Sequence, residues 1–432
     1  MRKKTIAILL ILALVASLSA KVETVADPAS PTGYTTTITY TDPEATDVKL
    51  VGSFTFYENN NPYLFAWSDA TSKVNDSPYN YIYGPEIWVN GNMRHIQDEG
   101  FTADMVKDGD TFSYTMQLPS ASYMYFFNIS KDGGETWQDK VCDPDNVPPQ
   151  NALSLNPQYR SQFFVPYDPE KQSPADDWTF VMPIEDRSKA GTIEYWNYIG
   201  DNGVVRPAQV YVPAGYDSER EEPYKVLYMS HGGGGFEGDW FHQGNANNIA
   251  DRVIADGKVE PFLIVTFEND SFKMFNPGNN PDYQAIFKDM KEYLIPFIEE
   301  HYNVSEKAED RGLAGLSRGA NVTTGFLFRE TKLFGYYALM SRGAVYLYAA
   351  DTNLQDVQSR RIYMGAGFAD FDLLRRTYNI LDMSSVLGLA WYFDDLGVDY
   401  NGGGSIKIVP GSHDWFTWPQ LALDFFSNYL WK

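Results

Sequence analysis

The sequence is poor in two residue types that often carry protein chemistry: it has one cysteine, Cys142, and five histidines. A single cysteine excludes a disulfide within the chain and a metal site built from several thiolates. Positive charge is also scarce, since 34 Lys and Arg stand against 57 Asp and Glu and the formal net charge is -23. Because such a surface repels phosphate backbones, we expect no nucleic acid partner.

The first 20 residues have the features of a secretory signal peptide. Arg2, Lys3 and Lys4 form a short cationic start, residues 5–16 are mostly apolar, and small residues follow up to Ala20. The apolar run is shorter than the roughly 20 residues that span a bilayer. We therefore expect cleavage near residue 20, a secreted protein, and no membrane contact after cleavage.

The length of 432 residues favours two domains rather than one core. Residues 34–165 alternate polar and apolar positions in short runs separated by turn signals, which predicts an immunoglobulin-like β-sandwich. A polar, proline-containing stretch at 166–189 is interpreted as a linker. Residues 190–432 alternate strand and helix patterns, which predicts an α/β domain with a mostly parallel sheet and helices on both faces.

The individual elements follow from the same periodicities. In the sandwich, strands are expected over 35–40, 48–56, 86–89, 111–118 and 123–129. In the α/β part, strands are expected over 225–230, 262–267, 312–316, 336–340, 362–365 and 406–409, and helices over 246–255, 283–302, 320–330 and 419–430. The predicted fold class is thus an α/β domain preceded by a β-sandwich.

Gly315-Leu316-Ser317-Arg318-Gly319 fits the pattern G-x-S-x-G between a predicted strand and a predicted helix. A nucleophilic serine on this tight turn needs neighbours without bulk two residues away on either side. The pattern alone also occurs by chance in a glycine-rich chain, so the strand–turn–helix context carries the prediction that Ser317 is a nucleophile. A near-copy around Ser341 has Leu339 at the first glycine position and is not expected to act.

His413 is the expected general base, because a serine needs one and no other histidine follows Ser317. The serine turn and the downstream histidine together predict an α/β-hydrolase. In that fold the acid lies between the serine and the histidine along the chain and accepts the second imidazole N–H. Asp370 and Asp372 both follow a predicted strand, and either could instead cap a helix that begins near Leu373. We favour Asp370.

The oxyanion hole needs two backbone N–H groups that point at the developing negative charge. One is expected from Arg318, the residue after the nucleophile. The other is expected from the glycine run after His231, with Gly233 and Gly234 as the candidates, because residues without side chains let amides approach the substrate. The alternative interpretation of that run is a flexible turn.

At this point residues 190–432 resemble carbohydrate esterase family 1, which contains feruloyl and acetylxylan esterases. The resemblance rests on several motifs in order: 212–216, the H-G-G-G-G-x-x-x-D-W run within 225–240, 255–258, the G-L-S-x-G turn, and H-D-W-x-x-W within 411–418. By position it implies Ser317, Asp370 and His413 as the catalytic triad. The chain departs from the family at Arg318, where methionine is usual, and a long cation there would narrow or re-aim the acyl pocket.

Residues 34–160 more weakly resemble the early-set modules of carbohydrate-binding family 48. The match rests on 112–127 and on Asp143-Pro144-Asp145-Asn146. In such a module Trp67, Trp88 and Trp137 would be candidates to bind glycan, and the alternatives are that they form core or cover the esterase site.

Together these features predict a secreted serine esterase that removes feruloyl, before acetyl, groups from plant cell-wall xylan. Trp240, Trp415 and Trp418 are candidates to line its pocket, and the chemistry requires no metal or organic cofactor. Two other hypotheses remain open. One is a siderophore esterase of the enterochelin type, and the other is a catalytically impaired glycan-binding protein on a hydrolase scaffold.

Overall fold

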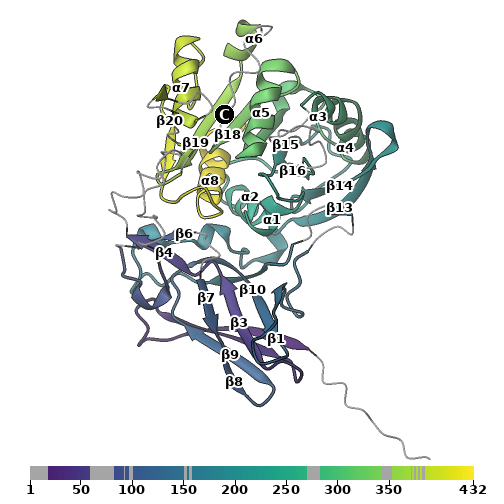
Figure 1. Cartoon of the computed structure of the whole chain (residues 1–432). Coiled ribbons are helices and arrows are strands. Elements are labelled where there is room, and N and C mark those ends of the chain that lie inside the picture. The colour runs from purple at the N-terminus through teal and green to yellow at the C-terminus, as the bar shows by residue number, and fades with distance from the viewer. Residues whose placement is uncertain are drawn as a thin grey trace, which may run out of the picture.

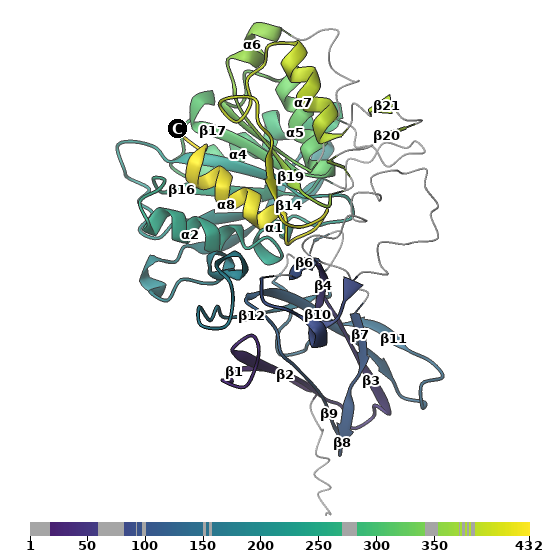
Figure 2. The ribbon, with the colours of Figure 1, turned by 90° about the vertical axis from the view of Figure 1, so that its left-hand side faces the viewer.

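The computed structural model describes residues 18–58, 82–91, 93–96, 101–149, 153–154, 158–269, 283–341, 353–370, 372–373, 376–377, 380–381 and 385–432. Figures 1 and 2 show a β-rich N-terminal part packed beneath an α/β part. No helix among the described residues combines the length and apolar character needed to cross a membrane. The predicted signal peptide lies almost entirely outside these residues.

The N-terminal part is a sandwich of two antiparallel sheets. One sheet has the order β1 (Ser19–Ala26), β2 (Tyr34–Thr41), β9 (Thr111–Met116), β8 (Val106–Asp108). The other has the order β11 (Gln138–Val141), β10 (Ala121–Ser130), β3 (Asp47–Gly52), β7 (Phe101–Asp104), and β12 (Ser161–Val165) also pairs with β10. Ile38 and Phe112 from the first sheet share one core with Leu50 and Phe127 from the second. The predicted β-sandwich is confirmed.

Two predicted strands in this part are wrong. The expected strand 48–56 is interrupted after Gly52, where an added Cβ would lie 2.4 Å from the ring of Phe54. A separate strand β4 (Thr55–Glu58) follows and forms a small sheet with β5 (Ile82–Tyr83) and β6 (Met93–Ile96). This small sheet is part of the β-sandwich, because Phe56 and Met93 are buried in the same core. The expected strand 86–89 is a 3-10 turn, Pro85–Ile87, because proline fixes φ and favours the first position of a helical turn.

The α/β part contains one eight-stranded sheet. Its order is β13 (Thr192–Ile199), β14 (Val205–Val212), β16 (Phe262–Phe267), β15 (Lys225–Ser230), β17 (Arg311–Leu316), β18 (Tyr336–Met340), β19 (Arg361–Gly367), β22 (Lys407–Val409). The pairs β13–β14 and β14–β16 are antiparallel and all the others are parallel. A separate two-stranded ribbon consists of β20 (Arg376–Thr377) and β21 (Ile380–Leu381).

Helices cover both faces of the large sheet, as expected for an α/β-hydrolase. One face packs against α3 (Tyr283–Asp289), α4 (Ile295–His301), α5 (Arg318–Arg329) and α7 (Val386–Asp395). The other packs against α1 (Asp239–His242), α2 (Ala246–Ala255) and α8 (Trp418–Asn428). A short helix α6 (Leu354–Gln358) precedes β19. The fold-class prediction is confirmed.

Residues 166–189, the expected linker, place several side chains against the sandwich. Trp178 and Val181 are buried in its core. Asn248 of α2 donates a side-chain hydrogen bond to the carbonyl oxygen of Val181 at 2.8 Å. The segment therefore attaches the two parts to each other, and the limits of the domains themselves stay a prediction.

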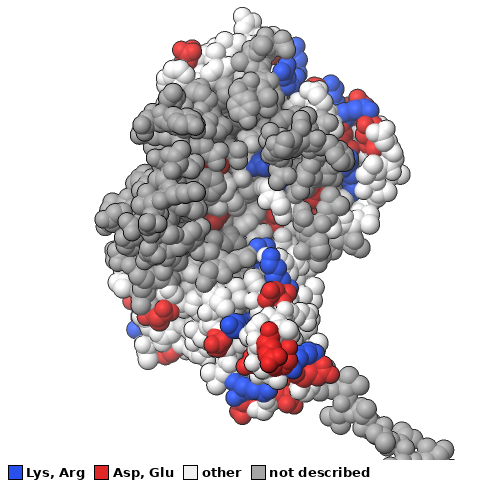
Figure 3. All heavy atoms as spheres, viewed as in Figure 1, with Lys and Arg blue, Asp and Glu red and all other residues white. Residues whose placement is uncertain are grey.

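The parallel strands fix the location of the candidate site. The carboxyl ends of parallel strands meet at one edge of a sheet, which is where ligands bind in open α/β folds. The loops after β15, β17, β19 and β22 carry the glycine run, Ser317, Asp370 and His413 respectively. The view in Figure 3 shows Lys and Arg interspersed with Asp and Glu over the sandwich end of the molecule, without a large basic patch on its described atoms.

Candidate active site

Ser317 lies on a strained turn between β17 and α5. Its backbone angles, φ 50° and ψ -117°, are rarely adopted by a residue with a side chain. An added Cβ at Gly315 would lie 2.2 Å from the carbonyl oxygen of Gly319, and one at Gly319 would lie 2.3 Å from that of Ser230. Both glycines are therefore required by close backbone approach, and the turn holds the Ser317 side chain at the sheet edge.

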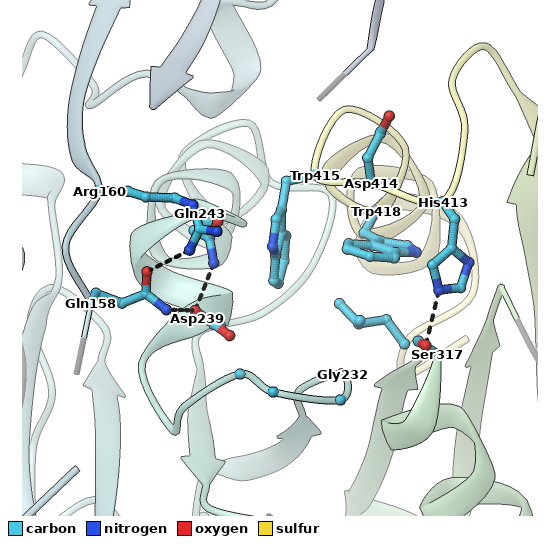
Figure 4. Close-up of a pocket in the computed structure, with 14 residues that line it drawn as sticks. Gln158, Arg160, Gly232, Asp239, Gln243, Ser317, His413, Asp414, Trp415 and Trp418 are labelled. Carbon is cyan, nitrogen blue, oxygen red and sulfur yellow. Dashed lines mark hydrogen bonds between the residues drawn. The ribbon is translucent and has the colours of Figure 1, made fainter. Parts of the chain in front are cut away.

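Ser317, His413 and Asp370 form a continuous chain of hydrogen bonds. The distance from His413 Nε2 to Ser317 Oγ is 2.9 Å (Figure 4), and that from His413 Nδ1 to Asp370 Oδ1 is 3.0 Å. Asp372 is farther away, with Oδ2 at 4.0 Å from Nδ1. Asp370 Oδ1 also accepts the backbone N–H of Asp372 at 2.8 Å, which fixes the orientation of the carboxylate.

The alternative role of these aspartates as helix caps is wrong. Residues 372–373 form a turn, and no helix begins near Leu373 within the described part of the chain. The next helix, α7, begins at Val386 and is capped by the side chain of Ser385. Asp370 and Asp372 are both buried beside the imidazole instead.

Ser341, the near-copy of the nucleophile, also adopts a positive φ of 60° but is fully buried. Its Oγ accepts a hydrogen bond from Trp418 Nε1 at 2.9 Å. This hydroxyl therefore supports an indole of the pocket wall and does not open into the pocket.

The backbone carbonyl group of Gly232 accepts hydrogen bonds from side chains that lie on the far side of the glycine run from the pocket. Its oxygen accepts from His231 Nδ1 at 2.7 Å and, more weakly, from Arg318 Nη2 at 3.5 Å. In a trans peptide the next N–H points in the opposite direction. The N–H of Gly233 is therefore directed away from buried His231 and toward the pocket that residues 232–235 line.

The side chain of Arg318 does not narrow the pocket, contrary to expectation. It is buried beneath the glycine run, where Nη2 donates to Asn269 Oδ1 at 3.2 Å. Asn269 in turn donates to the Ser230 hydroxyl and to the carbonyl oxygen of His231, both at 2.7 Å. Burial lowers the pKa of Arg318 to about 10, so the residue remains a cation. Arg318 is thus part of the support behind the glycine run.

The pocket beside Ser317 has a volume of about 480 Å³. Trp415 and Trp418 line it, and their rings meet edge to face at 4.9 Å. Trp240 was expected to line it as well but is fully buried, with Nε1 donating to the carbonyl oxygen of Ser230 at 3.0 Å. Its ring supports Trp415 from behind at 5.4 Å, so the Trp240 prediction is wrong.

The opposite wall of the pocket is polar and was missed in the sequence. Gln158 and Arg160 reach it from the chain just before β12, and Asp239 and Gln243 reach it from α1 and the residue after it (Figure 4). Asp239 Oδ1 accepts from Gln243 at 2.7 Å and from Gln158 at 3.2 Å. No motif marks Gln158 or Arg160, because the sandwich brings them to the site only through tertiary packing.

Comparison with known proteins agrees with this geometry. Residues 203–423 match the family described as "Putative esterase". The chain belongs to this esterase family. It is 33% identical over 178 residues, 39% of its length, to an endo-1,4-beta-xylanase/feruloyl esterase of Xylanibacter ruminicola, and the match covers 24% of that protein. It is 32% identical over 146 residues, 31% of its length, to endo-1,4-beta-xylanase Y of Acetivibrio thermocellus, with 13% of that protein covered.

This member of the esterase family thus spans less than a quarter of the length of the curated relatives it matches. Among solved structures it is similar to a CE1 ferulic acid esterase of Anaeromyces mucronatus, with 17% identity, a TM-score of 0.47, and coverage of 59% of this chain and 94% of the other. The resemblance of the N-terminal part to carbohydrate-binding family 48 stays a prediction. Of its three tryptophans, Trp67 lies outside the described residues, Trp88 is core, and the Trp137 indole bonds to the Gly134 carbonyl.

Asp239 provides a pH-dependent test of the polar wall. Burial penalises its charged form and raises its pKa from 3.8 to about 6. Between about pH 4 and pH 6 the folded state therefore holds a proton on Asp239 that the unfolded state has released. As the pH rises through this range, the contribution of Asp239 to the free energy of unfolding decreases. The Asp239→Asn variant cannot ionise at this position. We therefore expect the free energy of unfolding of the wild type, minus that of the variant, to fall by ~1 kcal/mol between pH 5 and pH 8.

Urea denaturation at the two pH values measures this difference. Asp186→Asn is the matched control, because that exposed carboxylate has a lowered pKa, caused mainly by its hydrogen bond with Ser188, and is ionised at both pH values. A stability difference between wild type and Asp239→Asn that is equal at pH 5 and pH 8 would contradict the prediction.

Proposed function

We propose that this protein is a secreted serine esterase that removes feruloyl groups, in preference to acetyl groups, from plant cell-wall xylan. The observation that carries the proposal is the hydrogen-bonded chain from Ser317 through His413 to Asp370. Membership of the esterase family supports the reaction type. The relative from Xylanibacter ruminicola, which is named for xylanase and feruloyl esterase activity, supports the substrate class.

In the proposed mechanism His413 acts first as a base and then as an acid. Nε2 removes the proton from Ser317 Oγ as the oxygen attacks the ester carbonyl carbon. Asp370 accepts the Nδ1–H bond and stabilises the imidazolium that forms. Nε2 then protonates the departing sugar oxygen, and a water activated by the same nitrogen releases the acid from the acyl-enzyme.

The proposed oxyanion hole uses backbone donors. The N–H of Arg318 stands at the first turn of α5, where the helix dipole favours negative charge. The orientation of the Gly232 carbonyl supports the N–H of Gly233 as the second donor. Gly234, with φ 76°, lies further along the same run and stays a candidate.

The pocket favours an aromatic acyl group over a small one. The indoles of Trp415 and Trp418 offer apolar surface for a flat ring, and the Asp239 and Gln243 side chains offer partners for its hydroxyl. An acetyl group would leave most of the 480 Å³ unfilled.

The two rival hypotheses fit the site less well. A siderophore ester of the enterochelin type is anionic, whereas Arg160 is the one cation among the described residues that line the pocket, beside the carboxylates of Asp239 and Asp414. A non-catalytic glycan-binding protein would not need Ser317 on a strained turn in contact with an imidazole.

Substitutions in the triad test the mechanism. We expect Ser317→Ala to abolish ester hydrolysis and Asp370→Asn to lower kcat by about 10³- to 10⁴-fold, because the wrong imidazole tautomer would face the serine. Asp372→Asn is the matched control and should lower kcat far less, since Asp372 lies 4.0 Å from Nδ1. Steady-state hydrolysis of methyl ferulate measures all three, and equal losses for both aspartates would refute the assignment of Asp370.

The support behind the glycine run is tested by Arg318→Met. The variant keeps the backbone donor but loses the hydrogen bonds to Asn269 and Gly232, so the Gly233 N–H is less firmly held. We expect kcat to fall by about tenfold with little change in KM, because the donor acts on the transition state. If KM rises while kcat is unchanged, Arg318 serves substrate binding instead.

The acyl preference is tested by comparing kcat/KM for methyl ferulate with that for methyl acetate. We expect the ferulate ester to be favoured by more than tenfold, because its ring buries apolar area against the two indoles. Trp415→Ala should reduce that ratio, while release of ferulate and acetate from arabinoxylan checks the natural substrate. A preference for acetate would overturn the feruloyl assignment and leave an acetyl esterase.

A further inference from the structure

The loop that carries His413 is held by the β-sandwich as well as by the α/β part. Gly411, two residues before His413, bonds to a side chain of β4, and Phe416, three residues after it, is inserted into the sandwich core. The proposed general base thus lies between two attachments to another part of the fold. Sequence patterns gave no indication of either contact.

The first attachment is the hydroxyl of Tyr57 in β4. It accepts the backbone N–H of Gly411 at 3.1 Å, and the side chain is only 2% exposed. The carbonyl oxygen of Gly411 in turn accepts the N–H of Ala369 at 2.9 Å, and Ala369 directly precedes Asp370. A single residue, Gly411, therefore joins Tyr57 to the loop of the base and to the loop of the acid.

The second attachment is a socket for Phe416 formed by His95, Tyr123 and Trp178. The Phe416 ring stacks on His95 with centroids 4.6 Å apart and an interplanar angle of 17°. Trp178 and Tyr123 meet it edge to face at 5.5 Å and 6.3 Å. Burial lowers the pKa of His95 to about 3, so the socket presents a neutral ring at the pH of esterase assays.

Between these attachments the loop has little freedom of its own. Gly411 has φ 128°, and an added Cβ would lie 2.3 Å from Thr417 Oγ1. The N–H groups of Phe416 and Thr417 both bond to Asp414 Oδ1, at 2.9 Å and 3.2 Å. The loop is a tight unit, so its position as a whole depends on what holds its two ends.

We propose that Tyr57 and the Phe416 socket are positioning residues of the esterase, through which the β-sandwich sets the distance between His413 Nε2 and Ser317 Oγ. The inference rests on the serine esterase function proposed above. Proton transfer requires the two atoms within hydrogen-bond reach, and a misplacement of about 1 Å costs on the order of 100-fold in rate. The sandwich is then a working part of the active site in addition to any contact with glycan.

The experiment uses the full chain with Tyr57→Phe and Phe416→Ala. Tyr125→Phe and Phe112→Ala are the matched controls, because both residues are buried in the sandwich core that receives Phe416 and neither is among the described contacts of the His413 loop. Three quantities are measured: kcat and KM for methyl ferulate, the pH dependence of kcat/KM, and the rate at which a fluorophosphonate labels Ser317.

For Tyr57→Phe and Phe416→Ala we expect kcat and the labelling rate to fall together by about tenfold or more, with KM within about twofold of wild type. The limb of the pH dependence of kcat/KM that reports the ionisation of His413 should also shift along the pH axis. The two controls should lower the melting temperature but keep kcat and the labelling rate.

Wild-type kcat and labelling in folded Tyr57→Phe and Phe416→Ala would overturn the proposal, as would equal losses in the two controls. If Phe416→Ala does not fold, Tyr57→Phe decides alone, since it removes one oxygen atom. Failure of the esterase function itself would look different, because the wild type would then hydrolyse no ester and Ser317 would not be labelled.

Discussion

The arrangement depends on one hydrogen bond, 2.9 Å long, between a serine and a histidine that are 96 residues apart in the chain. The surrounding backbone restrains the position of both residues. The serine is fixed by a backbone conformation that only two flanking glycines permit, and the histidine loop is bound at both ends. The strain at Ser317 is retained because β17, α5 and the Met340 carbonyl, which accepts the Ser317 N–H at 3.0 Å, surround the turn.

Behind this pair the protein uses buried polar groups to hold backbone in place. His231, Asn269 and Arg318 form a network under the glycine run, and Glu268 lies 3.4 Å from His231 Nε2. Burial disfavours charge on His231, but the carboxylates of Glu268 and Asp239 outweigh it and raise its pKa. A buried polar network of this kind holds the glycine run in one conformation. The glycines leave space for close approach to their backbone, and the network fixes the conformation of that backbone.

The sequence was sufficient for the parts of the protein that local pattern determines. Strands such as 225–230 and 262–267 coincide with β15 and β16. The motif with its single downstream histidine singled out Ser317 and His413, whereas the pattern alone did not separate Asp370 from Asp372. The pattern was insufficient where tertiary contacts decide. Trp240 stands in a motif beside Asp239, but only packing shows that its indole faces the core while the carboxylate faces the pocket. Likewise Gln158 reaches the pocket, and Tyr57 reaches the His413 loop, from remote segments in which no motif marks them.

The burial of Phe416 in the β-sandwich has a consequence for how such proteins can be recombined. The parts of multidomain chains are commonly treated as modules that can be cut and rejoined at linkers. Here an aromatic ring of the α/β part is buried in the core of the sandwich, and a tyrosine of the sandwich bonds to a loop of the α/β part. Replacing the α/β part alone would leave a void in the sandwich where Phe416 lies, and replacing the sandwich alone would leave the Gly411 N–H without the Tyr57 hydroxyl. Only inheritance of the two parts together preserves both contacts.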